Sequence, residues 1–255
     1  MLTKHLIIFC ACYVGILEAN QCALLPGDLE LTRGCTTRVH WKDGTAPRKI
    51  RYVSIKCDGR SLNSLQNVLN YFDQFNCSGP LHLQISKPSY SLEPPVFRRV
   101  ASHLYHLDLL DLHPTLPGLP KSFDGLRALK MLTLRFQDRS TAEVTMSKTL
   151  FVDLNKLEYV KIYARSVLLN IKPDTLKTLN HLQCLVLSGS NFACNCPTLD
   201  TVRWIQNQKP SSLHGQYKDP VTHRVEQCRI GTAVCGSTNE PITNQGQYNC
   251  TPSGI

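Results

Sequence analysis

The sequence predicts an α/β fold: a short solenoid of repeated units whose strands form a curved parallel sheet, with a disulfide-rich cap at each end. A pattern of apolar residues, L-x-x-L-x-x-L-x-L, recurs four times, starting at Leu104, Leu126, Leu154 and Leu179, and the third copy has Val160 and Ile162 at its last two positions. Cysteines gather before and after these repeats, and an apolar run opens the chain. The leucine spacing and a period of about 20–29 residues are those of a leucine-rich repeat. The predicted fold is therefore a short leucine-rich-repeat solenoid.

Residues 1–19 are predicted to be a secretory signal peptide. Lys4 precedes an apolar run from Leu6 to Leu17, and the small residue Ala19 follows, which is typical of such peptides. The run is too short to cross a bilayer, since a span takes about 20 residues. We expect cleavage after Ala19 or one or two residues away. The alternative is a buried N-terminal helix.

Ten cysteines remain after this cleavage, and an even number in an exported chain favours disulfides. They are Cys22, Cys35, Cys57, Cys77, Cys184, Cys194, Cys196, Cys228, Cys235 and Cys250. A zinc site typically contains Cys-x-x-Cys pairs, whereas the only close pair here is Cys194-x-Cys196. The sequence therefore predicts a disulfide framework, no metal site and no cofactor.

Residues 20–80 are expected to form the N-terminal cysteine-rich cap. The alternation from Ile50 to Ile55 predicts a strand that ends near Cys57. Four cysteines permit three pairings, and the pairing that we favour is Cys22 with Cys35 and Cys57 with Cys77.

The N-terminal cap is basic. Eight basic residues but only two acidic ones lie between Arg33 and Arg60, and the whole chain has a formal charge of +9. Such an excess favours anionic partners such as glycosaminoglycans, anionic lipids or microbial surface polymers. The alternative is solvated charge with no partner.

Residues 81–190 are predicted to hold about four or five repeats. Leu81-x-Leu83-x-Ile85 alternates as a short strand does, and we interpret it as an irregular repeat. The leucines of each repeat should fill one continuous core, so we expect Leu132 and Leu185 to be buried. The position that usually holds asparagine in such repeats is occupied by Thr115, Gln137, Arg165 and Ser190. We therefore expect a less regular solenoid, with a surface loop at 138–147.

The concave face is the predicted ligand-binding surface. Its side chains are those between the buried leucines, namely Gln84, Asp111, His113, Met131, Thr133, Arg135, Tyr159, Lys161 and Tyr163. Arg135, Lys161 and Tyr163 fall on adjacent predicted strands, and Arg and Tyr are frequent in binding hot spots. We expect this patch to be the centre of the site. The alternative is that the caps or the loop at 138–147 bind the ligand.

A second cysteine-rich segment follows the last repeat. It contains Asn191-Phe192, Cys194-x-Cys196, Leu199, Val202, Trp204-Ile205, Cys228 and Cys250. Residues 191–255 thereby resemble the C-terminal leucine-rich-repeat flank of Toll-like receptors, Slit-type and platelet glycoprotein-type proteins. The resemblance implies the disulfides Cys194–Cys228 and Cys196–Cys250, and a short helix with Leu199, Val202 and Trp204 over the last repeat. Cys184 and Cys235 have no counterpart in that family's cysteine pattern. One interpretation is a disulfide between them, and the alternatives are free thiols or a link to another chain.

Nine histidines raise the question of a metal or catalytic site. His103, His106 and His113 are close in sequence, but they fall at different angles of a repeat. No His-Glu-x-x-His or Gly-x-Ser-x-Gly motif is present, so we predict surface histidines and no enzyme activity. Asn76 and Asn249 match the glycosylation motif and are weak candidate sites, because each motif has a cysteine in the middle and a disulfide formed early can block modification.

These features predict ligand binding outside the cell. The resemblance implies a secreted protein that recognises a protein or microbial ligand, in innate immunity or as a soluble decoy. The alternative is an extracellular-matrix or growth-factor-binding protein with affinity for anionic glycans, and a disulfide-rich hydrolase is a third class. No later apolar stretch reaches the length of a membrane span. We expect no transmembrane segment and no nucleic-acid partner. We expect the chain to be a secreted protein, and the alternative is that it is the ectodomain of a longer receptor.

Overall fold

The computed structural model describes residues 34–44, 49–74, 79–90, 92, 96–115, 123–137, 142–172, 174–187, 189–193, 200, 203, 207, 215–229 and 233–235 of the 255-residue chain. Several predictions concern residues outside this set. They are the signal peptide, Cys22, Cys77, Cys194, Cys196, Cys250, Asn76, Asn249 and the flank helix with Leu199, Val202 and Trp204.

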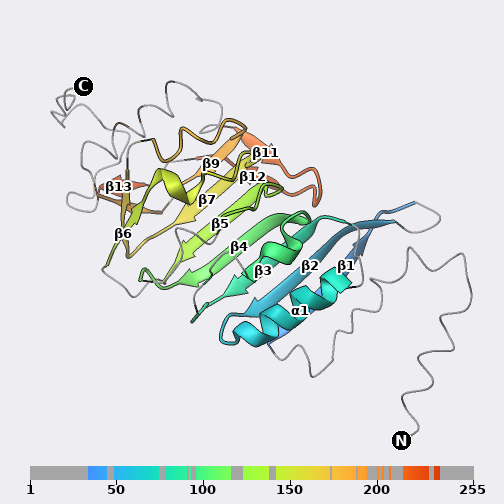
Figure 1. Ribbon diagram of the computed structural model, residues 1–255. Coiled ribbons are helices and arrows are strands. Elements are labelled where there is room, and N and C mark those ends of the chain that lie inside the picture. The colour runs from blue at the N-terminus through green and yellow to red at the C-terminus, as the bar shows by residue number, and fades with distance from the viewer. Residues whose placement is uncertain are drawn as a thin grey trace, which may run out of the picture.

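Seven strands form the main sheet (Figure 1). In spatial order they are β1 (Cys35–Trp41), β2 (Ile50–Asp58), β3 (Leu81–Ser86), β4 (Leu104–Leu112), β5 (Met131–Phe136), β7 (Tyr159–Tyr163) and β9 (Cys184–Val186). β1 is antiparallel to β2, and every later pair is parallel and follows the chain order. Parallel neighbours need crossover connections, so the chain returns behind the sheet between strands.

A second, smaller sheet is built from those return segments. It consists of β6 (Glu143–Met146), β8 (Leu168–Ile171), β10 (Asn191–Phe192) and β13 (Val234–Cys235), in the order β13-β10-β8-β6 and with parallel pairs. From β5 to β10 the chain therefore alternates between the main sheet and the second sheet. One apolar core contains Leu132 of the main sheet together with Leu169 and Phe192 of the second.

Helix α1 (Leu62–Gln74) covers the N-terminal end of the same core (Figure 1). Leu65, Val68, Leu69 and Phe72 are all buried, and their i, i+3, i+4, i+7 spacing places them on one helix face. The backbone N–H of Ser64 donates to Oγ of Ser61, 3.2 Å away, which caps the first turn. Short 3₁₀ helices, η5 (Arg98–Val100) and η7 (Lys148–Leu150), precede β4 and β7. The predicted α/β class with a parallel sheet is confirmed at this level.

The register of β4 differs from the sequence prediction. Leu107 and Leu109 pair with Leu132 and Leu134 of β5, whereas the leucine alignment had placed Leu110 and Leu112 there. Both pairs fit an L-x-L pattern, so sequence alone could not choose between them. In the fold, a break in the ladder after Leu109 and a positive φ of 54° at Asp111 turn Leu112 back into the core.

This shift changes two predicted site residues. Asp111 lies in the irregular part of β4, and His113 follows the end of that strand and is exposed. Neither side chain lies in the outward row of β4, although Oδ1 of Asp111 lies 4.0 Å from Nε of Arg135, another predicted site residue. The outward positions of β4 that pair with β3 and β5 are His106 and Asp108.

Ser190, at a position where asparagine was expected, pairs with buried backbone groups of one turn. The buried hydroxyl donates to the carbonyl of Ile162 at 3.0 Å and accepts from the N–H of Ala164 at 3.1 Å. Gln137 acts similarly, since its Nε2 donates to the carbonyl of Asp111 at 2.9 Å. Departures from asparagine at these two positions therefore still leave buried backbone groups paired.

Disulfides are present, but the predicted pairings are wrong where the structure describes them. Cys35 bonds Cys57, and Cys184 bonds Cys228. Cys35 and Cys57 lie directly opposite each other on β1 and β2, with Cα atoms 4.0 Å apart. This excludes Cys22–Cys35 and Cys57–Cys77.

The second bond excludes both Cys194–Cys228 and Cys184–Cys235. Cys184 is on the main sheet, whereas Cys235 lies on β13 of the second sheet. Cys235 is itself in a disulfide. Cys228 reaches Cys184 because the chain crosses the outward face of the main sheet, which no local pattern reveals.

Candidate functional site

The segment 215–229 crosses the outward face of the main sheet, and we call it the return hairpin. It contains β11 (Gln216–Lys218) and β12 (Val225–Gln227), which are antiparallel. Cys228 is bonded to β9, and the backbone of Arg229 pairs with that strand, so the exposed edge of the sheet is covered.

Polar contacts hold the return hairpin along several strands. The hydroxyl of Tyr217 donates to Glu158 at 3.1 Å, and that of Tyr105 donates to Asp219 at 3.1 Å. Asp219 is only 1 % exposed and also accepts from the N–H of Val221. Arg51 of β2 donates to the carbonyl of Val221. The hairpin therefore spans the face from β9 to β2.

Two residues predicted to be exposed are buried beneath this hairpin. Tyr159 is 2 % exposed and Met131 is 3 % exposed, and both pack in an apolar cluster with Tyr217 and Cys228. The ring centroids of Tyr159 and Tyr217 are 5.4 Å apart. The prediction assumed that solvent covers the whole outward face of the main sheet. The pattern of a single strand does not indicate that a distant segment covers that face.

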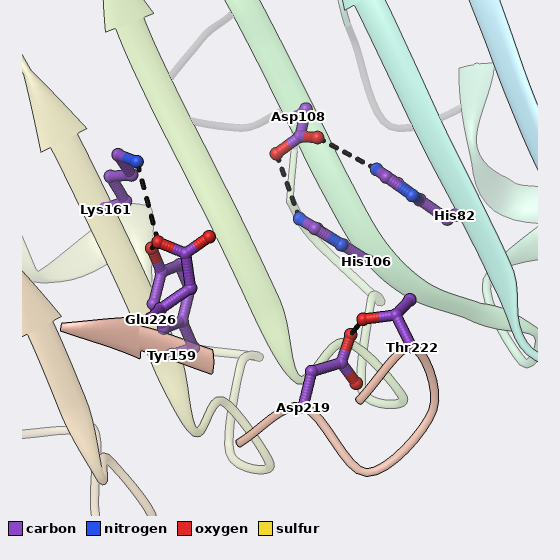
Figure 2. A network of polar contacts seen from close by, with 8 residues as sticks. All are labelled: His82, His106, Asp108, Tyr159, Lys161, Asp219, Thr222 and Glu226. Carbon is purple, nitrogen blue, oxygen red and sulfur yellow. Dashed lines mark hydrogen bonds and ion pairs between the residues drawn. The ribbon is translucent and has the colours of Figure 1, made fainter. Parts of the chain in front are cut away.

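The hairpin leaves a hollow of about 680 Å³ beside β5, β7 and β9, which we call the C-terminal hollow. Four predicted site residues, Thr133, Arg135, Lys161 and Tyr163, line it together with Glu226 and Arg229 of the hairpin region. The guanidinium carbon of Arg135 lies 5.6 Å from the centre of the Tyr163 ring, a cation–π distance. Lys161 Nζ lies 3.9 Å from Glu226 (Figure 2).

Gly189 allows the Tyr163 ring to form one wall of this hollow. Its φ of 77° favours glycine, and a Cβ there would come within 2.8 Å of Tyr163 Cε2. Any larger residue would displace the ring.

A second hollow, of about 340 Å³, lies on the other side of the hairpin, over β1 to β4, and we call it the N-terminal hollow. Arg38, Lys56 and Arg224 line it, and no carboxylate pairs with any of them among the described residues. Gln84, the remaining predicted residue, lies here and not with the tyrosine patch. His40 and Tyr52 stack at 3.9 Å on its wall.

Three further polar side chains form a cluster at this hollow: His82, His106 and Asp108. The Nε2 atoms of His82 and His106 lie 2.8 Å and 2.9 Å from the two oxygens of Asp108. The imidazole rings stack with centroids 3.9 Å apart and an angle of 4° between their planes. Figure 2 shows both rings edge-on, with a nitrogen of each turned to the carboxylate.

The environment favours an ionised Asp108 beside a neutral imidazole at His82. Burial alone would raise the pKa of Asp108, but hydrogen bonds from His106 and His82 outweigh it and hold this pKa well below its usual range. Burial lowers the pKa of His82, more than the bond to Asp108 raises it.

Sequence analysis missed this cluster. His103 and His113 are the neighbours of His106 along the chain, whereas its partner in space is His82 on the preceding strand, β3. The useful signal was the strand pairing, which sets His82 opposite His106. Among the described residues, these three side chains have donor atoms close enough to hold a metal ion, with all three atoms within 4.8 Å of one another.

Four tyrosines that are partly or fully buried are expected to lower the stability of the fold at alkaline pH. Burial, with a smaller effect of Asp58, raises the pKa of Tyr90 to about 12. Burial also raises the pKa of Tyr105, Tyr159 and Tyr217, with added effects of Asp219, Glu226 and Glu158 respectively. A pKa above the unfolded value of about 10 means that the unfolded chain loses these protons first. The free energy of unfolding should therefore be unaffected by these groups below pH 10 and fall as the pH rises above it.

This expectation is checked by urea unfolding at several alkaline pH values, together with absorbance titration of the phenolates. Stability that stays constant up to pH 12, or tyrosines that all titrate near pH 10 in the folded protein, would contradict it.

The sequence matches no protein-family model, and no curated protein matches it. Within the residues that the structure describes, no helix has the length and hydrophobicity that crossing a membrane requires.

Proposed function

We propose that this chain is an extracellular leucine-rich-repeat protein that binds an anionic protein or microbial ligand on the outward face of its main sheet. The leucine period, the parallel strands in chain order and the two disulfides support this class. In such solenoids the rigid concave sheet is a common binding surface. The predicted signal peptide and the disulfides, which are typical of oxidising compartments, support the proposal that the chain is secreted.

The charge of the two hollows carries the ligand proposal. In the C-terminal hollow, Arg135 lies 4.0 Å from Asp111 and Lys161 lies 3.9 Å from Glu226, and Arg229 adds a further positive charge. In the N-terminal hollow, Arg38, Lys56 and Arg224 surround the one carboxylate, that of Asp108. Cations that line a concave surface concentrate anions and steer them to it. A ligand that carries several negative charges would contact both hollows across the return hairpin.

Replacing Arg135, Lys161 and Tyr163 together with alanine tests this proposal. We expect the affinity for an anionic ligand to fall at least tenfold, about 1.4 kcal/mol, because two cations and an aromatic wall of the C-terminal hollow are lost. Binding is measured by calorimetry with a ligand captured from the native extracellular fluid, and the melting temperature is checked in parallel.

The matched control replaces Arg127, Lys156 and Lys172 with alanine. All three residues are exposed and lie between strands. It removes three cations and should leave affinity nearly unchanged. A loss of less than threefold in the first variant, about 0.7 kcal/mol, would show that the C-terminal hollow is not the site. An equal loss in both variants would show that only net charge matters.

A matrix or growth-factor-binding role with affinity for anionic glycans is the second candidate. It is favoured by Arg38 and Lys56, which come from the basic N-terminal cap and face the N-terminal hollow. Retention on heparin near physiological salt, lost when these two residues become alanine, would support this role. Capture of microbial cell-wall material without such retention would favour the first candidate.

A further inference from the structure

We propose that His82, His106 and Asp108 form a binding site for a divalent transition metal of the zinc class at the N-terminal hollow. The inference does not depend on which ligand the sheet face binds. It rests on the placement, the spacing and the surroundings of three donor atoms.

Placement follows from the strands. His82 on β3 is paired with His106 on β4, and Asp108 is two residues further along β4. Side chains two apart on a strand share a face, so the fold sets all three donors on the outward surface. Hydrogen-bonded strands in the middle of a sheet hold such positions firmly, which is the preorganisation that a metal site needs.

The donor types and the spacing suit zinc. Two imidazole nitrogens and one carboxylate oxygen are a frequent ligand set for catalytic zinc and for other divalent transition metals. Zinc binds such atoms at about 2.0–2.2 Å, so the donors of one ion lie up to about 4 Å apart. The three atoms here lie within 4.8 Å of one another. Small rotations of the side chains would bring them onto a common ion.

The surroundings leave a coordination position open. The three side chains are only 12–15 % exposed, and two of them, His82 and Asp108, line the N-terminal hollow. A fourth ligand can enter from that hollow. Because Arg38, Lys56 and Arg224 line it as well, this ligand is expected to be an anionic oxygen or water.

A purely structural role does not explain the cluster of His82, His106 and Asp108. Nδ1 of His106 is buried and has no hydrogen-bond partner among the described residues. An unpaired buried polar atom lowers stability, so the fold keeps this imidazole at a cost, and a functional role of its other nitrogen, Nε2, would explain why. Hydrophobic residues at these positions would avoid that cost.

Metal binding is tested on the full, untagged, disulfide-intact chain with Zn²⁺ and with Co²⁺ alone. We expect one equivalent of Zn²⁺ to bind in calorimetry, and Co²⁺ to give a visible absorption band that Zn²⁺ abolishes. His82→Ala, His106→Ala and Asp108→Asn should each weaken Zn²⁺ binding at least tenfold. His113→Ala and His181→Ala change exposed histidines outside the cluster and should bind as the parent does.

Circular dichroism and the melting temperature show whether each variant folds. Where His82→Ala does not fold, His82→Gln removes the imidazole and keeps a polar side chain. Absence of Zn²⁺ binding up to millimolar concentration would overturn the proposal. So would a parent affinity that persists in folded His82 and Asp108 variants, because the bound metal would then lie elsewhere.

Discussion

Shortening Leu132 to alanine is expected to lower the free energy of unfolding by about 2–5 kcal/mol. The side chain has no exposed surface. Its strand lies between β4 and β7, where Leu132 is paired with Leu107 and Val160. Removing the side-chain carbons loses their transfer free energy and leaves a cavity that hydrogen-bonded neighbouring strands cannot close.

Leu185→Ala should lower the free energy of unfolding by a similar amount. Leu185 is also fully buried, and on β9 it is paired with Val160, the neighbour of Leu132. Val152→Ala is the control, because Val152 is 59 % exposed and its shortening should change stability by no more than about 0.5 kcal/mol. Denaturant unfolding at equilibrium measures all three. A cost below about 1 kcal/mol at both leucines would show that these rows are not the core.

Removing the Cys184–Cys228 disulfide, with both residues changed to alanine, is expected to cost about 2–5 kcal/mol. The bond closes a loop with a sequence separation of 44, so its loss frees much conformational entropy in the unfolded chain. It also ties the return hairpin to β9, next to the buried cluster of Tyr159 and Tyr217. We therefore expect the hairpin to become sensitive to limited proteolysis while the main sheet stays intact.

Removing Cys35–Cys57 provides the comparison. That bond has a sequence separation of 22 and joins strands that are already paired by hydrogen bonds. Halving the loop length lowers the entropic effect by about 0.6 kcal/mol, and the hairpin should remain protected. Equal protease sensitivity in the two variants, or a hairpin that resists cleavage without Cys184–Cys228, would show that the disulfide does not hold it on the sheet.

The sequence by itself determined the parallel strands of the main sheet and the general position of the core. It did not reveal helix α1 or the second sheet, and the surface loop expected at 138–147 is wrong at β6, where Val144 and Met146 are buried. Leucine spacing and alternation are local signals, because burial on one face of a strand demands them within a few residues. They correctly predicted parallel strands at β5, β7 and β9 and the burial of Leu132 and Leu185. The even number of cysteines correctly predicted disulfides, since composition alone reports on the redox environment.

Tertiary structure alone decided which side chains meet. The partner of Cys184 is Cys228, 44 residues later, and the partner of His106 is His82 on the preceding strand, β3. The burial of Tyr159 depends on the return of residues 215–229 over the sheet. Such contacts depend on strand register and on the path of a distant segment. A local sequence pattern fixes neither the register nor that path. The L-x-L pattern fits β4 in two registers. An outward-facing residue has the same place in the pattern whether solvent or the return hairpin covers it.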